Sequence, residues 1–183
     1  MYSVLFFMGL KKIILVGYMA SGKSAVGRKL YDQLNYDYYD LDNYIEINYG
    51  TSVENIFKTE GELYFRQIER KSLEYIVAIK KNLIISLGGG TPCYFDTIDF
   101  LNSIKETKTF FLKTTVNTIY KRLNKSKIKR PLISHLIEET EIKEFIGKHL
   151  FERNFFYEKS EKKINTDGKT VREVANEIIK KLG

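Results

Sequence analysis

The stretch GYMASGKS, residues 17–24, decides the fold predicted for this chain. It directly follows the apolar run KIILV, residues 12–16, which is typical of a short buried strand. Residues 23–34 then place Val26, Leu30 and Leu34 on one stripe of a predicted helix. The stretch therefore joins a strand to a helix, and it fits the pattern G-x-x-x-x-G-K-[ST].

A loop of this kind has a physical use. Gly17 and Gly22 let the backbone turn its N–H groups inward, and with the start of the following helix they form a nest for an anion. Lys23 would reach the β- and γ-phosphates of a nucleotide, and the hydroxyl of Ser24 would ligate Mg²⁺. The loop therefore predicts binding of ATP or GTP. The alternative is an ordinary glycine-rich turn.

Strand and helix patterns alternate along the rest of the chain. Five strands alternating with helices predict a parallel sheet with helices on both faces, in a single domain spanning residues 1–183. Thr51 and Glu54 are expected to form the capping box of one helix, and Thr170 and Glu173 that of the last. Besides 12–16, strands are predicted at 36–42, 82–90, 108–114 and 162–165, and further helices at 43–49, 62–79, 115–123 and 142–158.

The composition limits the domain size, the partners and the compartment that can be expected. The chain has 183 residues, 43% of them hydrophobic, which suffices for one packed core. Its net charge of +7 comes from scattered lysines without an aromatic-basic signature, so no nucleic-acid partner is expected. The lone cysteine, Cys93, indicates a reducing compartment and hence the cytoplasm. Residues 1–9 are too short to span a bilayer and are expected to lead into the first strand, so no membrane association is expected.

Two acidic residues and three glycines end neighbouring strands. Asp40 and Asp42 follow the second strand, where a carboxylate can orient a hydroxyl and accept its proton, or hold the water shell of Mg²⁺. Asp42 would equally serve as a helix N-cap. Gly88, Gly89 and Gly90 end the third strand, where bare backbone suggests close approach of a ligand. A tight turn before Pro92 is the alternative.

Basic residues recur in three later segments. Arg66 and Arg153 are each flanked by aromatic residues, and arginine suits a two-point grip on a carboxylate. Helix surface pairs with nearby glutamates are the alternative for both. Lys127, Lys129 and Arg130 lie in a loop that is expected to be mobile and to close over the triphosphate. A solvated run of charge is the alternative there.

These motifs, taken together and in order, resemble those of the shikimate kinase family from about residue 11 to residue 182. GYMASGKS is similar to the family's GxMGxGK[ST], and DLD at 40–42 to its acidic pair. GELYFRQIE at 61–69 resembles GExxFRxxE, and SLGGGTP at 86–92 the triple-glycine segment. KRPLI at 129–133 is similar to the lid motif RPLL, and ERNFFYEKS at 152–160 to RxPxY.

The resemblance implies a P-loop NTPase-type α/β fold, a three-layer sandwich with a five-stranded parallel sheet and a mobile lid at about 124–134. It implies an ATP- and Mg²⁺-dependent kinase that phosphorylates the 3-hydroxyl of shikimate, and we expect a monomer. Lys23, Asp42 and Arg130 would be catalytic. Asp42, Arg66, Gly88, Gly89, Gly90 and Arg153 would bind shikimate, with a substrate-binding region at about 42–70. Gly17, Ala20, Ser21, Gly22, Lys23, Ser24, Ala25 and Arg130 would bind the nucleotide, and Ser24 and Asp40, the latter through water, would serve the metal.

Three residues depart from the family pattern. Ala20 replaces a glycine, and its methyl group is expected to require a negative φ. Phe155 replaces a proline after Arg153. Leu123 stands where a second lid arginine is expected, with Arg122 beside it.

Two other functions fit some of these features. One is a different small-molecule P-loop kinase, such as one that resembles gluconate kinase; the two arginines and three glycines argue instead for a compact carboxylic acid. The other is a nucleotide-dependent binding module without transfer activity. The acidic pair beside the nucleotide loop argues against that module.

Overall fold

Five parallel strands form one sheet in the order β2-β3-β1-β4-β5. The computed structural model of the chain describes residues 11–125 and 136–182, so the predicted roles of residues 1–9, of the lid and of Arg130 fall outside the described part. Every residue of β1 is buried, as the apolar run predicts for a central strand covered on both faces. The strands are β1 (Lys12–Val16), β2 (Asp37–Asp40), β3 (Leu83–Ser86), β4 (Thr107–Lys113) and β5 (Lys162–Asn165).

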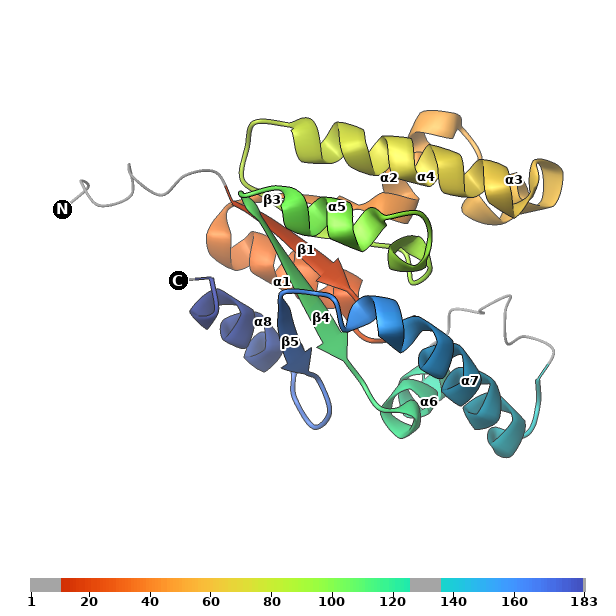
Figure 1. The fold of residues 1–183 in the computed structure, drawn as a ribbon. Coiled ribbons are helices and arrows are strands. Elements are labelled where there is room, and N and C mark those ends of the chain that lie inside the picture. The colour runs from red at the N-terminus through yellow and green to blue at the C-terminus, as the bar shows by residue number, and fades with distance from the viewer. Residues whose placement is uncertain (1–10, 126–135, 183) are drawn as a thin grey trace.

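Helices cover both faces of the sheet. Ile13 and Leu15 of β1 pack with α1 and α8, whereas Ile14 and Val16 pack with the larger core beneath α4, α5 and α7. Figure 1 shows these layers, with α6 and α7 lying beyond the arrowhead of β4. The helices are α1 (Lys23–Leu34), α2 (Leu41–Tyr49), α3 (Val53–Thr59), α4 (Gly61–Ala78), α5 (Thr97–Ser103), α6 (Val116–Lys125), α7 (Glu139–Tyr157) and α8 (Val171–Lys180), with a 3₁₀ turn, η2, at Thr91–Cys93.

The strand order places the predicted site. Chain order turns back at β1, which pairs with β3 on one side and β4 on the other. In an open parallel sheet, ligands bind at such a point, beyond the carboxyl ends of the strands. The glycine loop after β1, Asp40 at the end of β2 and the three glycines after β3 therefore meet at one edge.

The sequence predicted most elements within a few residues, and two predictions need correction. The cap of α3 is Ser52, whose hydroxyl accepts a hydrogen bond from the Asn55 amide at 3.1 Å, so the predicted capping box of Thr51 with Glu54 is wrong. Helix α5 was not predicted. It has seven residues, too few for a helical period to show, and it is held in place by burial of Ile98 and Leu101.

Within the described residues, none of the helices combines the length and the apolar character that a membrane crossing requires.

Candidate active site

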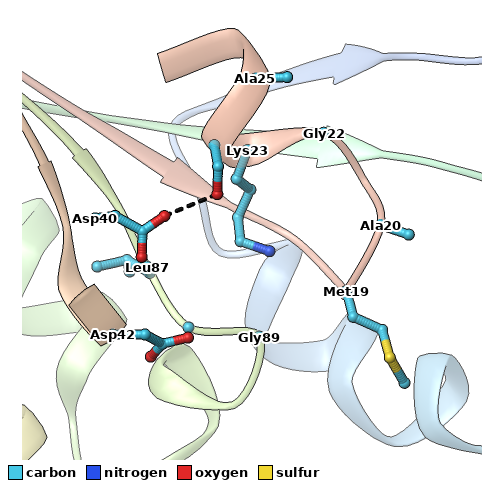
Figure 2. Close-up of a pocket in the computed structure, with 11 residues that line it drawn as sticks. Met19, Ala20, Gly22, Lys23, Ala25, Asp40, Asp42, Leu87 and Gly89 are labelled. Atoms are coloured by element: carbon cyan, nitrogen blue, oxygen red, sulfur yellow. Dashed lines mark hydrogen bonds between the residues drawn. The ribbon is translucent and has the colours of Figure 1, made fainter. Parts of the chain in front are cut away.

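The loop between β1 and α1 forms the wall of a cavity (Figure 2). Gly22, at the start of α1, has a φ of 104°, which only glycine adopts readily. The ammonium group of Lys23 donates to the carbonyl oxygens of Gly17, at 2.8 Å, and Tyr18, at 3.0 Å. Figure 2 shows its side chain directed between the loop and the two aspartates, where a phosphate group on the loop would meet it.

Ala20 lies in the left-handed region, with a φ of 58°. The expectation of a negative φ is therefore wrong. The loop keeps the conformation that a glycine would permit, and the methyl group is carried at an energetic cost of about 1 kcal/mol.

We expect Ala20→Gly to raise the free energy of unfolding by about 0.5–1 kcal/mol, because glycine occupies this region without strain. In a chain of this size the unfolding midpoint should rise by about 1–4 °C, which thermal denaturation would detect. Ala25→Gly, in the first turns of α1, is the matched control and should lower stability by a similar amount. Equal destabilisation by both substitutions would contradict strain at Ala20.

Asp40 and Ser24 supply oxygen ligands suited to Mg²⁺. The hydroxyl of Ser24 donates to Oδ2 of Asp40 at 2.7 Å (dashed line in Figure 2). The Tyr38 hydroxyl lies 3.3 Å from the same oxygen. A hydroxyl and a carboxylate are hard oxygen donors, and Mg²⁺ in kinases usually takes few protein ligands, with water and phosphate completing its shell. In the described part of the chain, no group of three His, Cys, Asp or Glu side chains stands ready to hold a metal.

Asp42 lies in the first turn of α2 and not at the end of the strand as predicted; Asp40 occupies the N-cap position, without a side-chain cap bond. Burial, reinforced by the negative charges of Glu69 and Asp40, raises the pKa of Asp42 to about 6. A carboxylate with a pKa close to the working pH is well matched to accepting a proton. It lines both the loop cavity and a second cavity beside it.

The three glycines leave room for charged side chains. A Cβ on Gly88 would lie 2.9 Å from Oδ1 of Asp42, and one on Gly90 would lie 2.5 Å from Nη2 of Arg66. Gly88 and Gly90 therefore allow a close approach of these side chains, whereas a Cβ on Gly89 would lie 3.5 Å or more from its nearest neighbours. The buried hydroxyl of Tyr157 donates to the carbonyl of Gly89 at 2.5 Å, which ties this segment to the end of α7.

Arg66 is buried in α4, with its guanidinium between two carboxylates. Its Nη1 donates to Oε2 of Glu69 at 2.8 Å and its Nη2 to Oε1 of Glu62 at 3.2 Å. Glu69 is itself 2% exposed and accepts from the Thr91 hydroxyl at 2.6 Å. The pair with Glu62 that was the alternative for Arg66 is thus present, but the arginine lines the second cavity as well.

Arg153 reaches the same cavity from α7. Its guanidinium carbon lies 5.5 Å from the centre of the Tyr18 ring, and the Tyr18 hydroxyl is 3.3 Å from Nδ1 of His149. The alternative partner Glu158 pairs with lysines of two strands instead, Lys113 and Lys163. Arg153 is therefore associated with the loop and the cavity rather than with a surface carboxylate.

The two cavities adjoin each other. They share Met19, Asp42, Gly88 and Gly89 among their lining residues. The arrangement brings a cradle for phosphate, an aspartate with a raised pKa and two guanidinium groups to one edge of the sheet.

Arg122 is a site residue whose function the sequence did not identify. From α6 it donates to the carbonyl oxygens of Ser21, at 2.9 Å, and Ala20, at 3.1 Å, and also to that of Thr166. It lines a third cavity behind the glycine loop, together with Lys169 and Thr170. The signal in the sequence was that Arg122 directly precedes Leu123, the position where a second lid arginine is expected.

The other two departures are accommodated. Leu123 is buried in the core, whereas the neighbouring Arg122 faces the loop. Phe155 is 68% exposed and packs on Phe156 in the uninterrupted helix α7.

Comparison with known proteins gives consistent results. A family model described as shikimate kinase matches residues 19–183. The shikimate kinase of Flavobacterium johnsoniae is 39% identical over 93% of this chain and 98% of its own length. That of Flavobacterium psychrophilum is 40% identical over 94% and 99%.

Solved structures agree with this result. A crystal structure of shikimate kinase from Bacteroides thetaiotaomicron superposes with a TM-score of 0.86 at 32% identity, covering 94% of this chain and 98% of that one. Shikimate kinase from Acinetobacter baumannii, in complex with shikimate, gives 0.82 at 30% identity, covering 94% and 93%. A gluconokinase from Sinorhizobium meliloti gives 0.60 at 13% identity, covering 94% and 91%, which is a likeness of fold alone.

Proposed function

The chain belongs to the shikimate kinase family, and from that membership we propose that it transfers the γ-phosphoryl group of ATP to the 3-hydroxyl of shikimate. The products are shikimate 3-phosphate and ADP, and the reaction is a step toward chorismate and the aromatic amino acids. One observation carries the assignment of residues: Arg66 and Arg153 line a cavity that adjoins the one beside Lys23 and shares lining residues with it.

We assign the acid side of the site to shikimate. Arg66 and Arg153 would pair with its carboxylate, and the backbone of Gly88, Gly89 and Gly90 would lie against its ring. A neutral sugar offers neither guanidinium group a carboxylate to pair with, which disfavours it relative to shikimate. The structure of shikimate kinase from Acinetobacter baumannii, which has a similar fold, is a complex with shikimate, and this supports shikimate as the acid.

The phosphate side would hold ATP. The backbone of Gly17 and of residues 20–25 would cradle the phosphates, with Lys23 on the transferring group. Mg²⁺, when bound through Ser24 and through water on Asp40, neutralises phosphate charge. The third cavity beside Arg122 lies next to this cradle and is the proposed place of the nucleoside.

The reaction itself asks for positioning and charge neutralisation more than for covalent catalysis. The 3-hydroxyl oxygen forms a bond to the γ-phosphorus as the bond to the β–γ bridging oxygen breaks. Asp42 would orient the hydroxyl and accept its proton. Arg130 and the lid at 124–134 remain predictions for closing the site and excluding water, and the cytoplasmic, monomeric state remains a prediction from the sequence.

A coupled assay for ADP release tests the function. With ATP and Mg²⁺, release should depend on shikimate and exceed release with gluconate by several orders of magnitude. Preference for gluconate would favour the other kinase. Nucleotide binding without phosphorylation of either acid would favour the binding module.

Arg153→Ala provides the cleanest test of the carboxylate clamp. We expect KM for shikimate to rise about 10²-fold, because a charged hydrogen-bonding partner of the carboxylate is lost, with KM for ATP within about twofold. Arg66→Ala is a poorer test, since it leaves the buried Glu69 unpaired and should destabilise the fold.

Arg172→Ala, at an exposed position of α8, is the matched control and should change neither constant. Equal losses of ATP and shikimate affinity in Arg153→Ala would contradict the clamp.

A further inference from the structure

Tyr94 follows the 3₁₀ turn after the triple glycine and has no part in the function proposed above. Its hydroxyl donates to Oε1 of Glu62 at 2.6 Å. Its ring lies over Arg66, with the guanidinium carbon 4.2 Å from the ring centre. Tyr94 therefore contacts both members of the Glu62–Arg66 ion pair, one with its polar end and the other with its π face.

The orientation of the Arg66 guanidinium depends on acceptors at both ends. Nη1 is fixed by Glu69 and Nη2 by Glu62, while Phe57 and Phe65 lie 5.6 and 5.1 Å from its carbon. A guanidinium carries its donors in one rigid plane, so holding two of its nitrogens sets the direction of the rest. Its Nε is buried and has no acceptor in the described part of the chain.

The two acceptors are not equally secure. The Glu69 side chain is 3% exposed and held by Thr91, whereas the Glu62 side chain, in the first turn of α4, is 52% exposed. An exposed carboxylate on a long side chain contributes little orientation unless another group holds it. The Tyr94 hydroxyl is such a group, and its hydrogen bond is the main cause of the lowered pKa of Glu62.

We propose that Tyr94 is a positioning residue for the carboxylate of the acceptor. Its hydroxyl holds Glu62 and its ring holds the plane of the Arg66 guanidinium, so that Arg66 is directed into the second cavity. The inference rests on the proposed function, because it takes shikimate as the acid that Arg66 meets. Tyr94 touches no reacting atom in this assignment.

Loss of the hydroxyl frees Glu62 in one of two ways. The carboxylate either turns to water, which loosens Nη2 of Arg66, or closes on Arg66 and competes with the incoming acid. Both outcomes weaken shikimate binding, and neither reaches the phosphate cradle. We therefore expect weaker binding only of substrates that carry a free carboxylate, with ATP binding unchanged.

Tyr94→Phe tests the hydroxyl while keeping the ring. We expect KM for shikimate to rise about three- to tenfold, the size of one ordinary net hydrogen bond because the effect reaches Arg66 only through Glu62, with kcat and KM for ATP within about twofold. Tyr75→Phe is the matched control, because Tyr75 is exposed on α4 and stacks on Tyr44 away from the cavity. It should leave all three constants unchanged.

A comparison of shikimate with its methyl ester separates positioning from a general loosening of the fold. The ester carries no charge for Arg66 to meet, so Tyr94→Phe should leave its KM, or its inhibition constant if turnover is too slow, unchanged. In a Glu62→Ala background, where the hydroxyl has no acceptor, Tyr94→Phe should change KM for shikimate by less than about 1.5-fold.

Three results would overturn the inference while the wild type still phosphorylates shikimate. These are an unchanged KM in Tyr94→Phe, equal effects on acid and ester, and an undiminished effect in the Glu62→Ala background. If Tyr94→Phe fails to fold, the inference requires that Glu62→Ala alone raises KM for shikimate and leaves KM for shikimate methyl ester unchanged. A wild type that does not phosphorylate shikimate would refute the proposed function instead.

Discussion

Asp42→Asn should lower kcat by about 10²–10⁴-fold, because an amide holds the acceptor hydroxyl without taking its proton. Coupled ADP release with saturating shikimate and ATP measures the loss. Asp32→Asn removes the same charge from an exposed position of α1 and should retain full turnover. Near-normal turnover in Asp42→Asn would remove this residue from the role of base.

The same substitution should stabilise the unliganded protein near neutral pH. The folded pKa of Asp42, about 6, lies above the value of about 3.9 for an unfolded aspartate. A raised folded pKa means that the protonated carboxyl favours folding below about pH 4, and that this advantage is lost as the pH rises through 6. Asp42→Asn avoids that loss, so its relative gain should reach about 1–3 kcal/mol at pH 7.5 and shrink toward pH 4.

Thermal unfolding at pH 4.5 and 7.5 measures the difference in stability. A gain in stability that appears only at the higher pH would show that burial, with repulsion from Glu69 and Asp40, destabilises the ionised form of Asp42. A gain of equal size at both values would assign it to packing of the amide instead.

Lys23→Met should reduce phosphoryl transfer by about 10³-fold or more while the fold is retained. Its ammonium is the group nearest to the expected terminal phosphate, and removing one such preorganised cation from a transition state typically has an effect of this size. Methionine keeps the length of the side chain but not the bonds to the carbonyls of Gly17 and Tyr18. Turnover, calorimetric binding of ATP and the unfolding midpoint are the three readouts.

Lys29→Met, further along α1, is the matched control for that substitution. It removes an equal charge from the same helix and should change neither turnover nor binding. An active, folded Lys23→Met protein would contradict the phosphate role of Lys23.

The architecture was predictable because it depends on local signals. The buried run at 12–16, the strand-to-helix loop at 17–24 and the alternation that follows fix a parallel sheet before any contact is known. Helix α5 escaped prediction because its seven residues are held by tertiary burial rather than by a periodic pattern. The cap at Ser52 was misplaced by one residue because Thr51 beside it has the same chemistry.

The sequence named several residues that line the two cavities, and their roles remain predictions. The contacts among them were only partly predictable. Asp42, Arg66 and Arg153 belong to motifs of one family, and they meet in one cavity to which α2, α4 and α7 each contribute a side chain. The carboxylates of Glu62 and Glu69 lie at helical spacing from Arg66, and such a pair was the stated alternative. The tyrosine over Arg66 could not be read from spacing, since it reaches Arg66 from the segment after η2. The positive φ of Ala20 was judged wrongly because the loop's own hydrogen bonds outweigh the strain of one methyl group.

The shared wall between the two cavities has a consequence for inhibitor chemistry. Met19, Gly88 and Gly89 line both cavities, and the two glycines add no side chain between them. A single compound that joins a cyclohexene carboxylate to a phosphate mimic would need only a short tether across Gly89. Once one half of such a molecule is bound, the other half is held close to its own cavity, so the second binding step becomes intramolecular and more favourable.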